Sequence, residues 1–580
     1  MNFFRTIVLP SLNLLGSKYR RSGVFLLPLL LLQSILDVLS VASLAPMALL
    51  IVRPESIMAN PFLLNLYETF SFTNEHYFAL AWAVAIAVFF ILKHGISILI
   101  TGFKARYAFG VSAFLSQRML DHFINLRYAE YHDLQSSHEQ VKVANLPISF
   151  ANNILLGLAT LITEGLILVL LLISLVIYDW RSVFFLMIII FPAVVYYRII
   201  RKKLNDINHS LRTNFPSLIH RLQQLFENFI EINLYQKRKY FIKKVQALND
   251  QLHQTQVLQT ILQANSFRLF ETTAAVGLCF LVLYTLVAQT SADETVMLLG
   301  LYTAAGFRAV PSFNRIFVSF LQIKTNEHVL IGLSKFETQR EESGSAEPVH
   351  FNTSLELRDI SFGFAHKPEL LVDVNLRIAK GQRVALTGPS GSGKTTLLLV
   401  IMRFLLETKG EILIDGIALR DHQTGAWRKR VAYVSQHPVI LDGSVIENVA
   451  FGVDPEMADK EKILELIRIL DLGTWLSQLP HGLMTRFGER GIKLSGGQRQ
   501  RLAIARALYT DAEILLFDEA TSQVDSITEK DVHEALKTVA HQNKTLIMVT
   551  HRETSLQFFD KVFHLEHGQI LETVRDKSHA

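Results

Sequence analysis

The 580-residue chain contains a single cysteine, Cys279, within a hydrophobic stretch. One thiol excludes a disulfide framework and a zinc site built from cysteines, and we expect Cys279 to be a small buried apolar side chain. Charged residues make up only 19% of the chain, and the formal net charge is +5. Lysine and arginine cluster in particular loops and form no continuous stripe, so nucleic acid is not an expected partner.

The N-terminus lacks the pattern of a cleavable signal peptide. Lys18, Arg20 and Arg21 precede an apolar run that is too long for a signal sequence, and no small-residue cleavage site follows it. The first 22 residues contain no acidic residue. An organellar presequence is one interpretation of this segment, and an amphipathic helix on the cytoplasmic face of a membrane is the favoured one.

Half of the residues are hydrophobic, and this excess is concentrated before residue 330. Runs such as residues 24–52 are long enough to cross about 30 Å of hydrocarbon as a helix. The loops after the second and fourth candidate spans are long and basic, whereas those after the third and fifth are short and carry acid, which predicts that both termini are cytoplasmic. Six spans are predicted, at residues 23–52, 77–103, 152–178, 182–200, 267–289 and 294–320.

The chain is too long for one domain and changes character after the last span. We predict a six-helix membrane domain at residues 1–340, a polar linker at 341–354 and a soluble α/β domain at 355–580. The apolar spacing of the long basic loops predicts that the spans continue as helices into the cytosol. Near the tips of these loops we expect two short helices, around residues 128–134 and 230–236.

Residues 388–396 read GPSGSGKTT, the pattern of a phosphate-binding loop. Small residues let successive backbone N–H groups surround phosphate oxygens at the start of a helix, while Lys394 supplies a positive charge. The hydroxyl of Thr395 is of a kind that binds Mg²⁺ next to the phosphates. The predicted phosphate-binding residues are Gly388, Pro389, Ser390, Gly391, Ser392, Gly393, Lys394, Thr395 and Thr396.

Two further motifs follow the loop. Residues 494–501 read LSGGQRQR, and residues 514–522 read ILLFDEATS. The four apolar residues 514–517 predict a buried strand that delivers Asp518 to Mg²⁺ and places Glu519 to polarise the attacking water. In this order and spacing, the three motifs resemble those of the ATP-binding cassette (ABC) ATPases.

The resemblance to ABC ATPases implies roles for further residues. It implies that Gln436, in VSQHPVI, reaches Mg²⁺, that His551, in IMVTHR, donates to the γ-phosphate, and that Phe364 stacks on adenine. Asp525, in SQVD where the family usually has SALD, is kept. The expected ligands are therefore ATP and Mg²⁺.

The same resemblance implies that two cassettes share each nucleotide. In the family, ATP lies between the phosphate-binding loop of one cassette and the LSGGQ motif of the other, here Ser495, Gly496, Gly497 and Gln498. Every one of these elements is intact in this chain. A homodimer with two competent sites is therefore expected.

Six spans followed by one cassette resemble the half-transporter arrangement of ABC exporters, and TRFGERG (485–491) resembles a loop typical of exporters. Residues 36–51, 60–70 and 309–316 further resemble the bacterial lipid-linked oligosaccharide flippases of the PglK type, which have an extra external helix between spans one and two. These resemblances imply a multi-pass protein of the bacterial inner membrane that flips or exports a lipid-linked oligosaccharide or a similar anionic lipid.

Four cations fall within the predicted spans: Lys93, Arg268, Arg308 and Arg315. Each costs about 2.5 to 3.5 kcal/mol near a bilayer centre unless it faces water or a partner. The spans also contain the acids Asp37, Glu164 and Glu271, so the four cations exceed these acids by one. This excess predicts a water-filled, net-positive cavity that forms the path of an anionic headgroup such as a pyrophosphate. The alternative is that several of them snorkel to the interface, with Arg268 paired to Glu271 one turn away.

Two other functions stay open. An exporter of another lipid, a peptide or a hydrophobic drug has the same architecture, and the response of ATP hydrolysis to polyprenyl-pyrophosphate glycans or to hydrophobic cations distinguishes it. A soluble ABC protein of the translation or chromosome-maintenance kind belongs to a different class. The six predicted spans and the single cassette argue against that class.

Overall fold

The computed structural model divides the chain into two compact units. The helical unit comprises Met1–Leu126 and Asp133–Gln339, and the sheet unit comprises Arg127–His132 and Arg340–Ala580. The structure describes residues 3–43, 61–72, 74–133, 136–178, 182–287, 292–336, 347–364, 368–488, 494–519 and 544–573.

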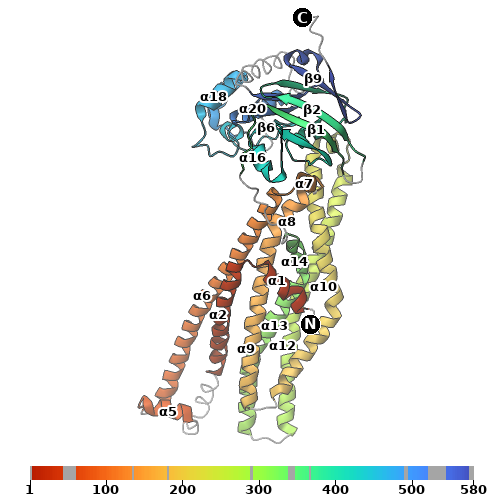
Figure 1. Ribbon diagram of the computed structural model, residues 1–580. Coiled ribbons are helices and arrows are strands. Elements are labelled where there is room, and N and C mark those ends of the chain that lie inside the picture. The colour runs from red at the N-terminus through yellow and green to blue at the C-terminus, as the bar shows by residue number, and fades with distance from the viewer. Residues whose placement is uncertain are drawn as a thin grey trace. The chain divides into compact units, whose positions relative to one another are not determined.

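The helical unit is built from long helices that run side by side, with shorter helices at their ends (Figure 1). Their bounds are η1 Phe4–Val8, α1 Leu9–Leu14, α2 Ser17–Ala42, α5 Pro61–Thr69, α6 Glu75–Ile124, α8 Ser136–Ser149, η2 Phe150–Leu155, α9 Leu156–Tyr178, α10 Ser182–Glu227, α11 Phe229–Leu234, α12 Arg238–Val287, α13 Ala292–Thr325 and α14 Glu327–Ser334.

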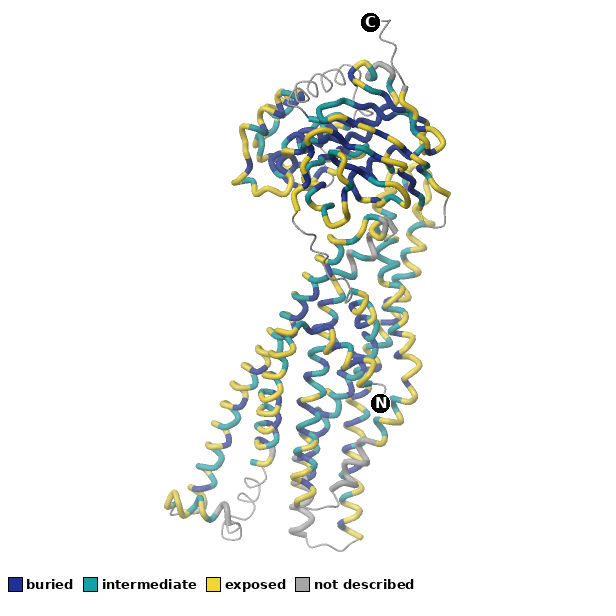
Figure 2. The backbone as a smooth tube through the Cα atoms, viewed as in Figure 1, coloured by how far each residue is buried: buried dark blue, intermediate teal, exposed yellow. Residues whose placement is uncertain are grey.

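Four helical stretches among the described residues are long and apolar enough to cross a membrane: Ser17–Ser40, His76–Ile124, Lys142–Ile177 and Arg238–Val287. Each predicted span overlaps a helix of the structure, and the total of six spans stays a prediction. Many residues of these helices are exposed (Figure 2), and a large share of the exposed ones are apolar, as expected of a surface covered by lipid.

Several local expectations can be compared with this unit. A short helix lies at α11, where the second long loop was predicted to carry one, and α5 falls within the segment that resembles an external helix. The N-terminal segment is helical, and Ile7 and Leu14 bury its apolar side against α14. The prediction that Cys279 is buried is wrong, because its side chain is exposed on the apolar part of α12.

The sheet unit contains a short helix, α7, from the middle of the chain, together with the C-terminal part of the sequence. Its elements are α7 Tyr128–Asp133, β1 Ser354–Phe362, β2 Leu371–Ala379, β3 Arg383–Thr387, α15 Lys394–Ile401, β4 Lys409–Ile414, β5 Ile417–Ala418, η3 Asp421–Gln423, α16 Thr424–Arg428, β6 Val431–Val434, α17 Val445–Val449, α18 Lys460–Ile469, α19 Gly473–Ser477, η4 Gly482–Met484, α20 Gly496–Tyr509, β7 Ile514–Asp518, β8 Thr545–Val549, η6 Glu553–Phe558, β9 Lys561–Glu566 and β10 Gln569–Thr573.

A six-stranded sheet with the order β10-β9-β3-β8-β7-β6 forms the centre of this unit. The strands from β9 to β6 are parallel, and β10 pairs antiparallel at one edge. Along β7, Leu515 and Phe517 enter one apolar core, whereas Ile514 and Leu516 enter the other. The apolar run therefore reflects a strand that is covered on both faces, as predicted. A second, antiparallel sheet has the order β2-β1-β4-β5.

Helix α7 lies where the first long loop was predicted to carry a short helix, and its residues up to His132 pack within the sheet unit. The ring of Tyr128 lies 5.9 Å from the ring of Phe404. The guanidinium of Arg428 lies 4.2 Å from the centre of the same ring. Phe404 is thus in contact with an aromatic ring and a cation at once.

Candidate functional site

The phosphate-binding loop connects β3 to α15 at the edge of the sheet where the parallel strands end. Gly388 has φ 140°, and a Cβ atom there would lie 2.2 Å from the carbonyl oxygen of Leu565. Gly393, with φ 103°, is the N-cap of α15. Only glycine fits at position 388, which explains why the phosphate-binding motif begins with this residue.

Lys394 begins α15 and is 6% exposed. Its Nζ donates to the carbonyl oxygens of Gly388 at 2.9 Å and Pro389 at 2.7 Å, so the side chain folds back over its own loop. Burial lowers the pKa of Lys394, while Glu519 and Asp518 oppose that effect. The Oγ atom of Ser392 is buried and has no hydrogen-bond partner among the described residues, which leaves a polar atom available to phosphate.

Asp518 lies at the end of β7, 5% exposed. One of its oxygens accepts hydrogen bonds from the Thr395 hydroxyl at 2.8 Å and from the Tyr433 hydroxyl at 3.3 Å. Burial raises the pKa of Asp518, and these two hydrogen bonds act in the opposite direction. The structure thus joins two predicted Mg²⁺ ligands and adds Tyr433, which sequence reasoning missed. Its aromatic ring on β6 gives no separate signal, because strands commonly carry such residues.

Glu519 directly follows Asp518 and has the left-handed backbone angle φ 49°. Gln436 Nε2 donates to its Oε2 at 2.6 Å, and His551 Nε2 lies 3.0 Å from its Oε1. Three residues predicted from separate motifs therefore meet at one carboxylate. This convergence follows from the parallel order of β6, β7 and β8, whose carboxyl ends share one edge of the sheet.

The signature motif opens α20. Ser495 is the N-cap: its Oγ accepts from the N–H of Gln498 at 3.2 Å, and its own N–H donates to Gln498 Oε1 at 2.9 Å. Ser495 is exposed, and Gly496 and Gly497 form the first turn of the helix. Phe364 is also exposed and meets the Phe362 ring at 5.1 Å. Asp525 lies outside the described residues.

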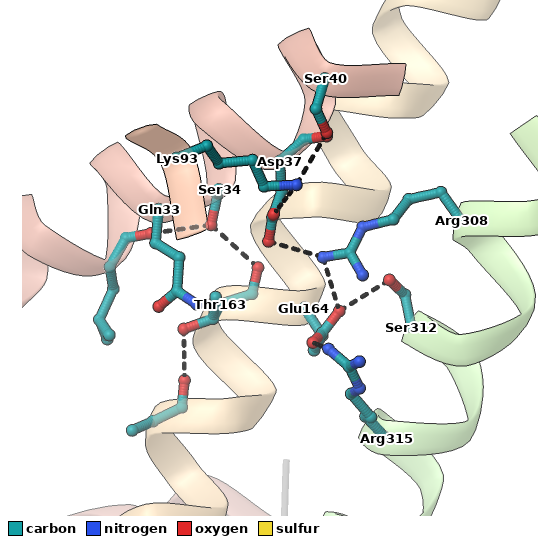
Figure 3. Close-up of polar contacts among 12 residues, drawn as sticks. Gln33, Ser34, Asp37, Ser40, Lys93, Thr163, Glu164, Arg308, Ser312 and Arg315 are labelled. Atoms are coloured by element: carbon teal, nitrogen blue, oxygen red, sulfur yellow. Dashed lines mark hydrogen bonds and ion pairs between the residues drawn. The ribbon is translucent and has the colours of Figure 1, made fainter. Parts of the chain in front are cut away.

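A cluster of charged residues, buried except at Arg315, joins four helices of the helical unit (Figure 3). Asp37 on α2 pairs with Lys93 of α6 and with Arg308 of α13, each at 2.7 Å. Glu164 on α9 pairs with Arg315 at 2.7 Å and with Arg308 at 3.6 Å. We call these five residues the charge cluster. Three cations against two carboxylates leave it one positive charge in excess.

Hydroxyl groups complete the charge cluster. Ser312 donates to Glu164 at 2.7 Å, and Lys93 donates to the hydroxyl of Ser40 at 2.8 Å (Figure 3). Arg308 is paired with two of the acids that the sequence placed in the spans, Asp37 and Glu164. The sequence could not reveal this, since Asp37 and Arg308 are 271 positions apart.

The charge cluster borders a cavity of about 720 Å³. Lys93, Arg308 and Arg315 line the cavity, as does Glu271. The side chain of Arg315 is 55% exposed, whereas that of Arg308 is 14% exposed, so Arg315 has donors free for a ligand. Arg268 is exposed on α12, and it forms no ion pair with Glu271 in the described part of the chain.

Comparisons with known proteins agree with both halves of this description. Residues 371–522 match the sequence model of a family described as ABC transporter. The ATP-dependent lipid A-core flippase of Paraburkholderia xenovorans (strain LB400) is 30% identical over 477 residues, which cover 79% of this chain and 77% of the relative. The protein of that name from Burkholderia pseudomallei (strain 1710b) is 30% identical over 436 residues, 73% of this chain and 71% of the relative.

A solved structure, described as a bacterial Atm1-family ABC exporter with ATP bound, has a TM-score of 0.76 to this chain. It covers 96% of this chain, and this chain covers 95% of it, at 20% identity. At this identity the likeness shows the fold, which is a helical membrane region joined to a nucleotide-binding α/β region. This is the fold class predicted from the sequence.

Replacing Gly388 by alanine should weaken ATP binding by about tenfold or more, because strained backbone of this kind costs about 1–3 kcal/mol and the new Cβ also meets Leu565. The measurement is equilibrium binding of ATP to the purified full-length protein. Gly391→Ala is the matched control, since Gly391 has φ 82° but no atom within 4 Å of an added Cβ. Equal losses in both variants would contradict the steric argument.

Glu519→Gln should keep ATP binding and lower the rate of nucleotide hydrolysis by about a hundredfold or more, because the carboxylate that accepts a proton from water is lost. Hydrolysis and binding are measured on the same preparation. Glu566→Gln, which changes an exposed carboxylate at the end of β9, is the control and should hydrolyse at the normal rate. Normal hydrolysis by Glu519→Gln would show that Glu519 has another role.

Proposed function

The chain belongs to the ABC transporter family, and on that premise we propose that it flips or exports a lipid-linked oligosaccharide or a similar anionic lipid across the bacterial inner membrane. It is an exporter whose ATPase domain drives transport. The observation that carries the proposal is the half-exposed Arg315, which lines a large cavity and pairs with Glu164.

The phosphate-binding loop supplies the contacts for the triphosphate of ATP. Backbone N–H groups at the start of α15, the Ser392 hydroxyl and the Lys394 ammonium are all donors that converge on this loop. In the structure Lys394 donates to loop carbonyl oxygens, and a phosphate oxygen is a stronger acceptor for an ammonium. Phe364 is proposed to stack on the adenine through its exposed ring.

Thr395, Asp518 and Gln436 would hold the Mg²⁺ ion. All three present oxygen atoms, the ligand type that Mg²⁺ prefers, and the Thr395–Asp518 hydrogen bond already holds two of them together. The ion supplies charge neutralisation at the phosphates. Tyr433 supports Asp518 from the adjacent strand.

Glu519 is proposed to orient and polarise the attacking water. Both of its oxygens are engaged, one by Gln436 and the other by His551, so its position is determined from two sides. His551 is proposed to contact the γ-phosphate as well. Asp525, from the segment that follows Glu519, is proposed as a further contact of the nucleotide site.

A homodimer is proposed because the signature motif needs a nucleotide held by another copy of the chain. The Ser495 hydroxyl and N–H each form a hydrogen bond with Gln498 at the start of α20, and Ser495 is exposed. The exposed start of α20 is suited to bind phosphate oxygens through its N–H groups. Since the chain carries both halves of such a site, two identical copies complete two sites.

The substrate class follows from the cavity. Relatives of the chain are named lipid A-core flippases, which supports a lipid substrate in general. The lining of the cavity contains three cations, Lys93, Arg308 and Arg315, against one carboxylate, Glu271. An anionic headgroup would be favoured there by this excess charge. Arg268 is proposed as a further contact along the path, on α12.

An exporter of a hydrophobic compound is the second candidate. Phe90, Phe267 and Phe307 also line the cavity, and aromatic rings bind apolar or cationic molecules. The excess positive charge argues against a cationic substrate. Stimulation of hydrolysis by lipid-linked glycans or by hydrophobic cations separates the two functions.

Mixing subunits tests the shared nucleotide site. We expect Lys394→Ala and Ser495→Arg to be inactive as homodimers, whereas each mixed dimer keeps one interface that lacks both changes. The mixture should therefore regain ATP hydrolysis, up to about half of the normal rate per dimer if the two sites act independently. Differently tagged subunits allow the mixed dimer to be isolated before the assay. No regained activity in an isolated mixed dimer would contradict the two-chain site.

Replacing Arg315 by alanine should lower flipping of an anionic lipid-linked sugar by about tenfold or more, because a charge-assisted hydrogen bond is lost. Hydrolysis without substrate should persist, since Glu164 keeps Ser312 and Arg308 as partners. Arg315→Lys should restore part of the flipping through its charge. Flipping is measured in proteoliposomes and normalised to inserted protein.

Arg198→Ala provides the matched control for Arg315→Ala. Arg198 is an exposed arginine on α10 and does not line this cavity. Its loss should leave flipping unchanged. Unchanged flipping in Arg315→Ala as well would remove the anionic substrate from the proposal and leave a generic exporter.

A further inference from the structure

A second cavity, of about 320 Å³, lies further along α13, on the C-terminal side of Arg308 and Arg315. It is lined by the N-terminal segment at Phe3 and Thr6, by α10 and α13, and by the first residue of α14. Lys324, which lines it, follows Arg315 by nine residues, or about 13 Å along the helix. This cavity is therefore separate from the one beside the charge cluster.

One wall of the second cavity is an aromatic stack. The ring of Phe320 stacks on Phe3 at 5.4 Å and meets the edge of Tyr197 at 5.1 Å. The stack joins the N-terminal segment to α10 and α13, and it gives the cavity a fixed apolar side.

The opposite side of the second cavity carries hydrogen-bond donors. The side chains of Arg201 and Asn205, one turn apart on α10, have no hydrogen bond or ion pair among the described residues. Lys324 donates to Glu327 at 3.1 Å. Two cations and one carboxylate leave an excess positive charge, and the guanidinium of Arg201 has no acceptor within the part of the chain that the structure describes.

The position of these residues along their helices indicates the kind of ligand. The predicted spans end at residues 200 and 320, so Arg201 and Lys324 lie just beyond two span ends while Tyr197 and Phe320 lie just inside them. Aromatic rings are typical of the edge of the hydrocarbon region, and cations just outside it lie at the depth of the lipid headgroups. The residues of this cavity have that arrangement. By the predicted topology this is the cytoplasmic leaflet.

We propose that this second cavity binds the phosphate headgroup of an anionic phospholipid, with Arg201 and Lys324 on the phosphate and the aromatic stack against the glycerol and upper acyl chain. The lipid would fasten the N-terminal helix to α10 and α13. This site is independent of which substrate the protein transports.

The test is titration of the purified full-length protein with dioleoyl phosphatidylglycerol or with phosphatidylcholine, read by native mass spectrometry. Wild type should bind the anionic lipid at least about tenfold more tightly. Arg201→Gln should remove most of that preference and keep the normal melting temperature, because Arg201 has no partner in the described part of the fold. Lys202→Gln, the exposed neighbour outside the cavity, is the matched control.

The outcomes separate a built site from general attraction to charge. Charges near an anionic membrane contribute about fivefold each whatever their position. Equal losses in Arg201→Gln and Lys202→Gln, or no preference in wild type, would overturn the proposal. Competition by soluble glycerol phosphate at the same concentration as the lipid would show that the cavity takes free phosphate esters, and would overturn the assignment to a membrane lipid.

Position is tested with a reporter at the mouth of the second cavity. Thr6→Trp places an indole beside it, and phosphatidylglycerol brominated on its upper acyl chain should quench the added fluorescence more than brominated phosphatidylcholine does. Arg201→Gln in the same background should abolish that difference. A difference that persists would place the bound lipid elsewhere and overturn the proposal.

Discussion

A charge between membrane-spanning helices is costly unless an opposite charge neutralises it, and the helical unit is organised around this constraint. The charge of Arg308 on α13 is neutralised by two carboxylates, Asp37 on α2 and Glu164 on α9. Removing one partner of such a buried group costs more than the pair contributes, because the other charge is left uncompensated. Helix movements that separate these helices would therefore have to exchange ion-pair partners, and the proposed anionic substrate would be one such partner.

The sheet unit is organised by a different constraint, which is the common direction of its parallel strands. Because β3, β6, β7 and β8 all end at one edge, residues from four distant motifs are delivered to one place. Glu519 shows the effect, since its two oxygens are held by residues that follow β6 and β8. The geometry of the proposed catalytic site is thus set by strand order, and the loops add the hydrogen-bond donors.

The sequence predicted most accurately what depends on short stretches of chain. The apolar run of β7, the turn at Gly388 and the short helices α7 and α11 were all predicted from local residues. What it missed depends on long-range packing: the two partners of Arg308, the support of Asp518 by Tyr433, and the exposure of Cys279 on a helix surrounded by lipid. Hydrophobicity alone cannot separate a side chain that faces lipid from one that faces protein.

The sheet unit is discontinuous in sequence, since it includes residues Arg127–His132 as well as the C-terminal part of the chain. The ring of Tyr128 packs against the ring of Phe404. Phe404 is 39% exposed with this contact in place, so it would be more exposed without Tyr128. A cassette excised at the start of β1 would therefore present a larger apolar patch, with Arg428 stacked on one side of it. A cassette exchanged between relatives of this protein should therefore be exchanged together with α7. By the same reasoning, α7 and the surface around Phe404 are expected to change together in evolution.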